Sequence, residues 1–219
     1  MFAVRGKALY PEMDFMFSMI REVLTTSRLD DTKRLYEIIA RVKSRAQANL
    51  VSAGHSTAVL RGASYASPMA AFQDEMAGIG YYQFIEKLEK NFDSCKEEIV
   101  KNLRKVMEEV LRPENFSVSY TGERESLDAV KVQVGEIKKV LFNGQKPETS
   151  SQPSCTKKNE AFKTSGQVQY VAQSGNFRKK GLEYTGALEI LKVILSYDYL
   201  WINIRVKGGA YGCMSGFGV

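Results

Sequence analysis

One polar stretch divides the sequence, and this division constrains the fold more than any other feature does. Residues 143–160 contain two prolines, one glycine and almost no apolar side chain. A stretch of this kind adds nothing to a hydrophobic core and is typical of an exposed linker. We therefore expect two folding units, residues 1–145 and 160–219, joined by a linker at 146–159.

Most of the first unit has the spacing of amphipathic helices, with apolar residues three and four positions apart. Pro11 suits the first turn of a helix, and Asp30 or Asp31 can cap a second one. Ser94 and Glu97 match a capping box, in which each side chain bonds the other residue's backbone N–H. The predicted helical stretches are residues 15–24, 35–50, 81–92, 99–111 and 127–141.

Other short stretches alternate apolar and polar residues, which is typical of half-buried strands. These stretches are residues 2–8, 115–121, 167–172 and 210–219. In the second unit a helix is predicted over 184–195, and Gly208-Gly209 ends the helical turn that follows it. We therefore predict an α+β fold with helices packed on a mostly antiparallel sheet. The second unit has too few elements to bury a core of its own, so we expect the chain to be part of something longer.

Charge and cysteine content exclude several classes of function. The net charge is +6, but the densest basic spots, Lys157-Lys158 and 178–180, lack the interleaved aromatic residues of a nucleic-acid stacking surface. No stretch reaches the ~18 apolar residues that a membrane span needs. The three cysteines are far apart and indicate neither a disulfide framework nor a zinc knuckle. We expect no nucleic acid and no membrane among the partners.

The single histidine, His55, limits the metal chemistry that the chain can perform. The inverted zinc motif H-x-x-E-H needs two histidines. His55 has no carboxylate at a telling spacing, and we interpret it as a hydrogen-bonded structural residue. The sequence therefore predicts no metal site in this chain.

The most informative segment for chemistry is residues 199–212. An apolar helical turn leads into Arg205, and a diglycine separates it from Tyr211. Arginine offers planar donors with a fixed charge, and tyrosine offers one neutral O–H donor. Two such donors can hold a carbonyl oxygen or the oxyanion that it becomes. The alternative is that Arg205 pairs with a nearby acid and Tyr211 packs in a sheet.

Several of these segments resemble the C-terminal half of presequence proteases, a branch of the pitrilysin/insulinase-type zinc metallopeptidases with the inverted H-x-x-E-H motif. The string RVKGGAYG at 205–212 carries the resemblance most specifically, with YLW at 199–201 before it. The strings GIGYY at 78–82 and QVQYVA at 167–172 extend it along nearly the whole chain.

The resemblance implies four similar α+β domains in two halves, joined by a hinge, which close around an unfolded peptide. Residues 1–145 would be most of the third domain, and residues 160–219 the truncated start of the fourth, so that both domains are incomplete. Zinc would be the cofactor of the parent enzyme, held by the absent N-terminal half and not by this chain.

The resemblance also implies roles for individual residues. Arg205 and Tyr211 would be catalytic, since they would bind the substrate backbone and stabilise the tetrahedral intermediate. Gly208, Gly209 and Ala210 would contact substrate. The implied function is part of a zinc metalloendopeptidase that degrades short unstructured peptides, with this chain inactive alone. The alternative is a non-catalytic binding or scaffold half of an inactive family member.

The implied partners are an unstructured peptide and the N-terminal half of the same polypeptide, and open strand edges would favour self-association. The first residues lack the pattern of a signal or transit peptide, so we expect no targeting signal within this sequence itself. We expect a soluble protein of the bacterial cytoplasm or an organelle matrix.

Overall fold

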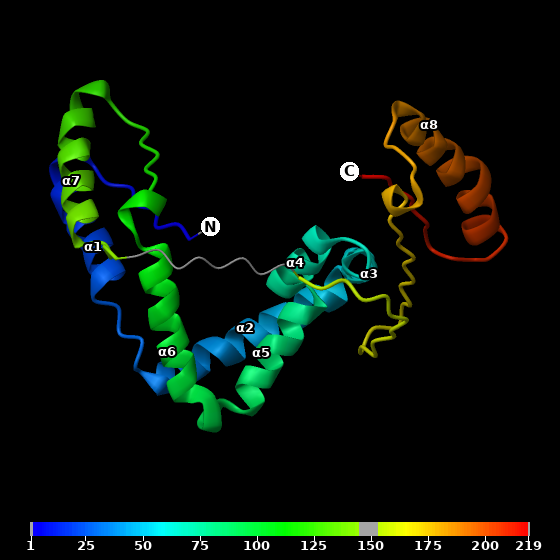
Figure 1. The fold of residues 1–219 in the computed structure, drawn as a ribbon, viewed down its shortest axis with the longest axis horizontal. Helices are drawn as coiled ribbons and strands as arrows, with labels where there is room; N and C mark the ends of the chain where they lie inside the picture. The colour runs from blue at the N-terminus through cyan, green and yellow to red at the C-terminus, as the bar shows by residue number, and fades with distance from the viewer. Residues whose placement is uncertain (1, 145–152, 219) are drawn as a thin grey trace.

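The computed structural model describes residues 2–144 and 153–218, and helices dominate this part of the chain. Short 3₁₀ turns and one π-helix accompany the α-helices, which Figure 1 shows as an open, angled arrangement. The elements are η1 (Tyr10–Glu12), α1 (Met13–Thr25), α2 (Thr32–Ser52), α3 (Gly54–Ser64), α4 (Pro68–Ala77), α5 (Ile79–Lys90), α6 (Phe92–Val110), η2 (Pro113–Asn115), η3 (Arg124–Ser126), α7 (Leu127–Val140), η4 (Arg178–Lys180), α8 (Gly186–Ile194) and the π-helix η5 (Leu195–Val206).

The predicted α+β fold with an antiparallel sheet is wrong, because no strand occurs in residues 2–144 or 153–218. The alternating stretches are extended, but a strand exists only where backbone N–H and C=O groups pair with a neighbour. Two of their aromatic side chains contact helices instead. Phe116 packs against the core between α1 and α7, and Tyr170 lies against Gly54 at the start of α3.

Helices α1 and α7 lie side by side and form the first core (Figure 1). Its buried residues are Phe17, Leu24, Val130, Ile137 and Leu141. Those on α1 and α7 recur at helical spacing, so each helix presents one apolar stripe to the other, and Leu141 directly follows α7. This core joins the N-terminal residues to the end of the first unit.

Helices α2 and α5 form the second core, which contains Ile39, Ile85 and Phe92. An ion pair between Lys43 and Glu89 links the same two helices. Helix α6 begins at Phe92 and leads from this core towards α1 and α7 (Figure 1). Helices α3 and α4 pack on each other beyond the far end of α2.

Helices α8 and η5 contact each other and lie beyond α3 and α4 (Figure 1). Neither helix contains a buried residue. The predicted linker at 146–159 lies in part outside the described residues, and its described part, 153–159, has no helix. No helix in the described part of the chain is long and apolar enough to cross a membrane.

Candidate functional site

The π-helix η5 and the diglycine after it position the residues singled out in the C-terminal segment. The N–H of Lys207 donates to the carbonyl of Ile202, five residues back, at 3.0 Å. Gly208 then leaves room for the backbone, because an added Cβ would lie 2.6 Å from the carbonyl oxygen of Ile204. Gly209 has a φ of 72°, a conformation that glycine adopts at little cost. The chain therefore turns sharply between Arg205 and Tyr211.

The guanidinium of Arg205 lies near two aromatic rings. Its carbon is 4.6 Å from the ring centroid of Trp201 and 5.7 Å from that of Tyr211. Cations within about 6 Å of an aromatic centroid are attracted to the ring face. Nη1 of Arg205 also donates a hydrogen bond to the backbone carbonyl of Tyr211. These contacts fix both the position and the direction of the positive charge.

The side chain of Tyr211 is open to solvent. The residue is 92% exposed, and its hydroxyl has no hydrogen-bond partner among the described residues. Arg205 forms no ion pair with any acidic residue in the described ranges, which differs from the alternative considered from the sequence. Arg205 and Tyr211 therefore lie together with Gly208, Gly209 and Ala210 in the turn between them. Their chemical roles stay predictions.

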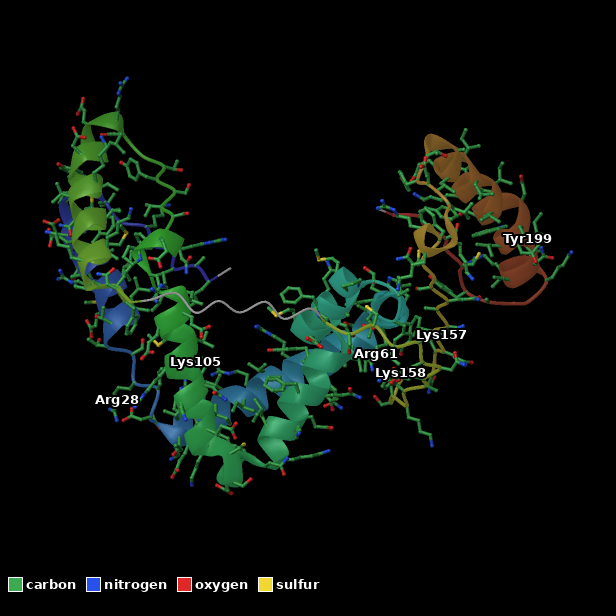
Figure 2. All side chains as sticks on the ribbon, viewed as in Figure 1. Arg28, Arg61, Lys105, Lys157, Lys158 and Tyr199 are labelled. Atoms are coloured by element: carbon green, nitrogen blue, oxygen red, sulfur yellow. The ribbon has the colours of Figure 1, made fainter. Side chains whose placement is uncertain are left out.

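Exposed aromatic side chains lie on η5, the helix that leads into this turn. Tyr197, Tyr199 and Trp201, all on η5, are 68%, 60% and 43% exposed, and Figure 2 labels Tyr199 on this helix. The backbone groups of residues 212–218 form no hydrogen bond with other described backbone groups, while the Ser215 hydroxyl lies 3.1 Å from that of Ser196 and donates to the carbonyl of Lys192. Unpaired extended backbone beside aromatic side chains is suited to binding an extended peptide.

Sequence reasoning missed a second polar centre, which forms around Asp74 on α4. Asp74 is only 2% exposed. Its Oδ1 accepts from the N–H of Ile79 at 3.0 Å and its Oδ2 from the N–H of Gly80 at 3.1 Å, so the carboxylate caps the start of α5. An added Cβ at Gly78 would lie 2.3 Å from the Asp74 carboxylate, so glycine is needed there.

Arg61 on α3 links this carboxylate to the second unit. Its Nη1 donates to Asp74 at 2.6 Å, and its Nε and Nη2 donate to Glu160 at 2.8 and 3.1 Å. The hydroxyl of Tyr65 also donates to Glu160. The guanidinium lies 5.8 Å from the ring centroid of Phe162, and Figure 2 labels Arg61 near the segment that carries Lys158. We call these residues, Arg61, Tyr65, Asp74, Glu160 and Phe162, the Arg61 cluster.

The Arg61–Glu160 ion pair shifts the pKa values of its two partners. The hydrogen bond from Arg61 holds the pKa of Glu160 below its usual value, and the bond to Glu160 raises the pKa of Arg61. Both shifts favour the charged forms. The sequence signal that could have indicated this centre is the spacing of Asp74, Gly78 and Gly80. Glu160 gave no such signal, because it ends a polar stretch.

The described residues do not fit a zinc ion, since they contain no group of three or more His, Cys, Asp or Glu side chains that could hold a metal. His55 lies with its ring centroid 6.2 Å from that of Tyr170. Cys95, Cys155 and Cys213 are free thiols.

Two families of known proteins match this chain, one before the polar stretch and one from near its end. Residues 1–88 match the family described as Peptidase M16C associated, and residues 159–219 match the PreP C-terminal domain. Each match contains all or part of one of the two sites described above. The C-terminal match holds the turn with Arg205, and the N-terminal match holds Arg61 and Asp74.

Individual relatives extend these matches over nearly the whole chain. A Clostridium perfringens protein named HypA is 34% identical over 211 residues, which are 96% of this chain and 22% of that protein. The Arabidopsis thaliana presequence protease 1, chloroplastic/mitochondrial, is 28% identical over 215 residues, covering 95% of this chain and 19% of its own length. A mitochondrial presequence protease of Yarrowia lipolytica is 27% identical over 220 residues, covering 96% and 22%. The chain thus spans about a fifth of the length of these relatives.

Proposed function

Because the chain belongs to the presequence-protease type of M16C peptidases, we propose that it forms part of the C-terminal half of a zinc metalloendopeptidase that degrades short unstructured peptides. The observation that carries the proposal is the turn that brings Arg205 and Tyr211 together beside exposed aromatic side chains. A longer polypeptide would supply the remainder of the active site.

In this proposal Arg205 and Tyr211 act on the oxygen of the peptide bond that is cleaved. The Tyr211 hydroxyl is exposed, and it can donate to that oxygen without breaking a bond to a described residue. Arg205 would exchange the carbonyl of Tyr211 for the substrate oxygen and keep its stacking on Trp201. Donors already aimed at a developing negative charge are among the largest contributions to catalysis.

Zinc would be held outside this chain. M16 peptidases are generally zinc-dependent, but the described residues contain no group that fits the ion. We therefore assign no metal ligand here and derive no step that passes through the metal.

The domain assignment follows the two family matches. We propose that residues 1–145 are most of a third peptidase domain and residues 160–219 the start of a fourth, with 146–159 between them. The matches to residues 1–88 and 159–219 support this division, because the proposed linker lies almost wholly between them.

The partners in this proposal are an unstructured peptide and the N-terminal half of the same polypeptide. Extended residues 212–218 have backbone groups free to pair with an extended peptide, within the described part of the chain. The large apolar side chains of α8 and η5 are exposed, which also favours association between copies. The relatives named above are mitochondrial, chloroplastic or clostridial, and we propose an organelle matrix or a bacterial cytoplasm for this chain.

A second candidate function is a non-catalytic binding or scaffold half. It is favoured by one observation: the guanidinium of Arg205 is already engaged by the carbonyl of Tyr211 within the chain. In a scaffold this contact would persist with a peptide bound, whereas in a peptidase it would give way to the substrate.

The test uses a chimera in which this chain replaces the matching region of the Arabidopsis thaliana presequence protease. Hydrolysis of an unstructured peptide is measured for the chimera, for this chain alone and for the chimera with a chelator added. We expect activity only in the chimera, and its loss with the chelator. A folded chimera without activity would favour the scaffold, and chelator-sensitive activity of this chain alone would contradict the proposed division of labour.

A further inference from the structure

An extended segment of the second unit lies against helix α3 over its whole length. This segment, residues 160–176, has no helix and no strand. We call it the clasp. It contacts α3 near Arg61 through Glu160, turns back near Val51, where Gly166 lies, and then follows α3 to its C-terminal end. Figure 1 shows it between the helices of the first unit and α8.

Two glycines of the first unit make room for the part of the clasp that follows Gly166. An added Cβ at Gly54 would lie 2.4 Å from the ring of Tyr170, and one at Gly62 would lie 3.1 Å from Oγ of Ser174. Beyond them, Nδ2 of Asn176 donates to the carbonyl of Ala66 at 3.3 Å. The surface of α3 therefore fits the clasp in two ways: its glycines leave space for side chains of the clasp, and Arg61 supplies a positive charge.

The first residues of the clasp, 160–162, are held by the Arg61 cluster. Arg61 bonds Glu160 through two nitrogens and lies over the ring of Phe162, so a carboxylate and an aromatic ring two residues apart share one guanidinium. Two parallel N–H···O bonds to a carboxylate give strength and a defined direction. Because Asp74 holds the third nitrogen and caps α5, the contact extends into the helices of the first unit.

Helices α8 and η5, by contrast, have little packing of their own. Neither contains a buried residue, and Ile190, Val193 and Val206 are each more than half exposed. Packed apolar surface is what normally fixes the position of a helix pair. The contacts that the structure shows between the two family-matched regions lie mainly along the clasp.

We propose that α3 is a docking surface for the clasp and that this docking, rather than helix packing, holds the α8–η5 unit in place. The two recognition features are the Glu160–Arg61 ion pair and the fit of Tyr170 over Gly54. The inference goes beyond the proposed peptidase role and does not depend on it.

The only tryptophan in the sequence, Trp201, lies on η5 and reports directly on this unit. The experiment measures time-resolved fluorescence anisotropy of Trp201 in the full chain. In the wild type, most of the decay should follow the slow tumbling of the whole molecule. In the double variant Glu160→Gln, Tyr170→Ala, a faster nanosecond component should become the larger part of the decay, because the unit moves independently.

The matched control is the double variant Glu183→Gln, Val171→Ala. It removes one carboxylate and one large side chain from the same region, at an exposed acid and at a residue that is 85% exposed. The control should keep the slow decay. Helix content, measured by far-UV circular dichroism, should be unchanged in both variants.

A third variant, Gly54→Leu, acts from the side of α3 and leaves the clasp sequence intact. It should give the same fast component, so the proposal stays testable if the first double variant loses helix content. A slow decay in both the clasp variant and Gly54→Leu would overturn the proposal. So would a dominant fast component in the wild type.

Discussion

At the scale of single residues, Asp74 connects three helices. Its carboxylate lies on α4, accepts two backbone N–H groups at the start of α5 and binds Arg61 of α3. The side chain is 3% exposed and that of Arg61 is 16% exposed, so water replaces these contacts poorly. Removing one partner of a buried ion pair leaves the other charge uncompensated.

Replacing Asp74 by Asn should therefore lower the free energy of unfolding by about 3 kcal/mol. The shape of the side chain is kept, so the loss reports the charge and its hydrogen bonds. Urea unfolding followed by circular dichroism measures it. The control is Asp128→Asn on α7, where the carboxylate pairs with Lys131 at the surface, and little change is expected. Equal unfolding midpoints for the two variants would contradict the role given to Asp74.

Tyr211 carries the prediction for catalysis. In an active chimera, Tyr211→Phe removes one O–H donor and should reduce kcat by about 10²-fold, the usual effect of losing an oxyanion donor. Steady-state kinetics on an unstructured peptide measures the change. Tyr197→Phe is the control, because Tyr197 is also exposed on the same unit and lies outside the turn. A near-normal rate for Tyr211→Phe would remove its proposed role.

Single residues were predictable from the sequence where their partners are close in the chain. Asp31 caps α2, as predicted, since its side chain accepts from the N–H of Arg34 three residues later. The capping box at Ser94 and Glu97 is wrong, because α6 already begins at Phe92 and Ser94 donates to the carbonyl of Asn91. The contact of Arg61 with Glu160 joins residues 99 apart, and no local pattern indicates it.

At the scale of elements, helices were predictable and strands were not. The apolar spacing that predicted helices at 15–24, 35–50 and 127–141 corresponds to α1, α2 and α7. Period-two alternation describes one face of an extended chain, but it does not say what pairs with that chain. Here helices cover the extended stretches at Phe116 and Tyr170. The π-helix η5 also had no sequence signal, because its apolar spacing fits an ordinary helical turn.

Two glycine-to-alanine variants, one on α7 and one at the start of α3, test helix propensity against docking, because the two are expected to have opposite effects on stability. Gly135→Ala on α7, where an added Cβ meets nothing within 4 Å, should stabilise the chain by about 0.5–1 kcal/mol. Gly54→Ala should instead destabilise it, because the new Cβ displaces Tyr170. Thermal unfolding measures both. In a Tyr170→Ala background the penalty at Gly54 should disappear, and its persistence there would show that Tyr170 is not the cause.

At the scale of the whole molecule, the joining of the two family-matched regions depends on charge. The carboxylate of Glu160 faces Arg61 and Tyr65 on the first unit and Lys158 on its own segment, with Asp74 on the other side of Arg61. Arg61 lowers the pKa of Glu160. A lowered pKa in the folded state contributes stability above the unfolded pKa, and this contribution is lost as the pH falls through the folded value.

The difference in unfolding free energy between the wild type and Glu160→Gln should therefore be constant near neutral pH. It should shrink once the pH falls below the ordinary glutamate value of about 4.3 and vanish at lower pH. Urea unfolding at a series of pH values checks this, with Glu183→Gln as the control variant. A difference that stayed constant throughout acid titration would mean that the ionised Glu160 carboxylate is not what joins the regions.

The overall arrangement was the least predictable level. The polar stretch at 143–160 lies almost wholly between the regions that the two families match, and the division into two domains stays a proposal. Where the second region lies depends on the clasp, and its contacts with Gly54, Gly62 and Ala66 leave no periodic pattern in the sequence. The importance of a missing side chain, as at the two glycines, can be recognised only when the surface that packs against it is known.

The order of contacts along the clasp also has a mechanical consequence. A force pulling on the C-terminal end would load Asn176 first, then Ser174, then Tyr170, and would reach the ion pair of Glu160 last. Bonds loaded one after another yield at lower force than bonds loaded together. In a single-molecule stretching experiment the second unit should therefore peel away in small steps at low force, well before α3 itself is pulled apart.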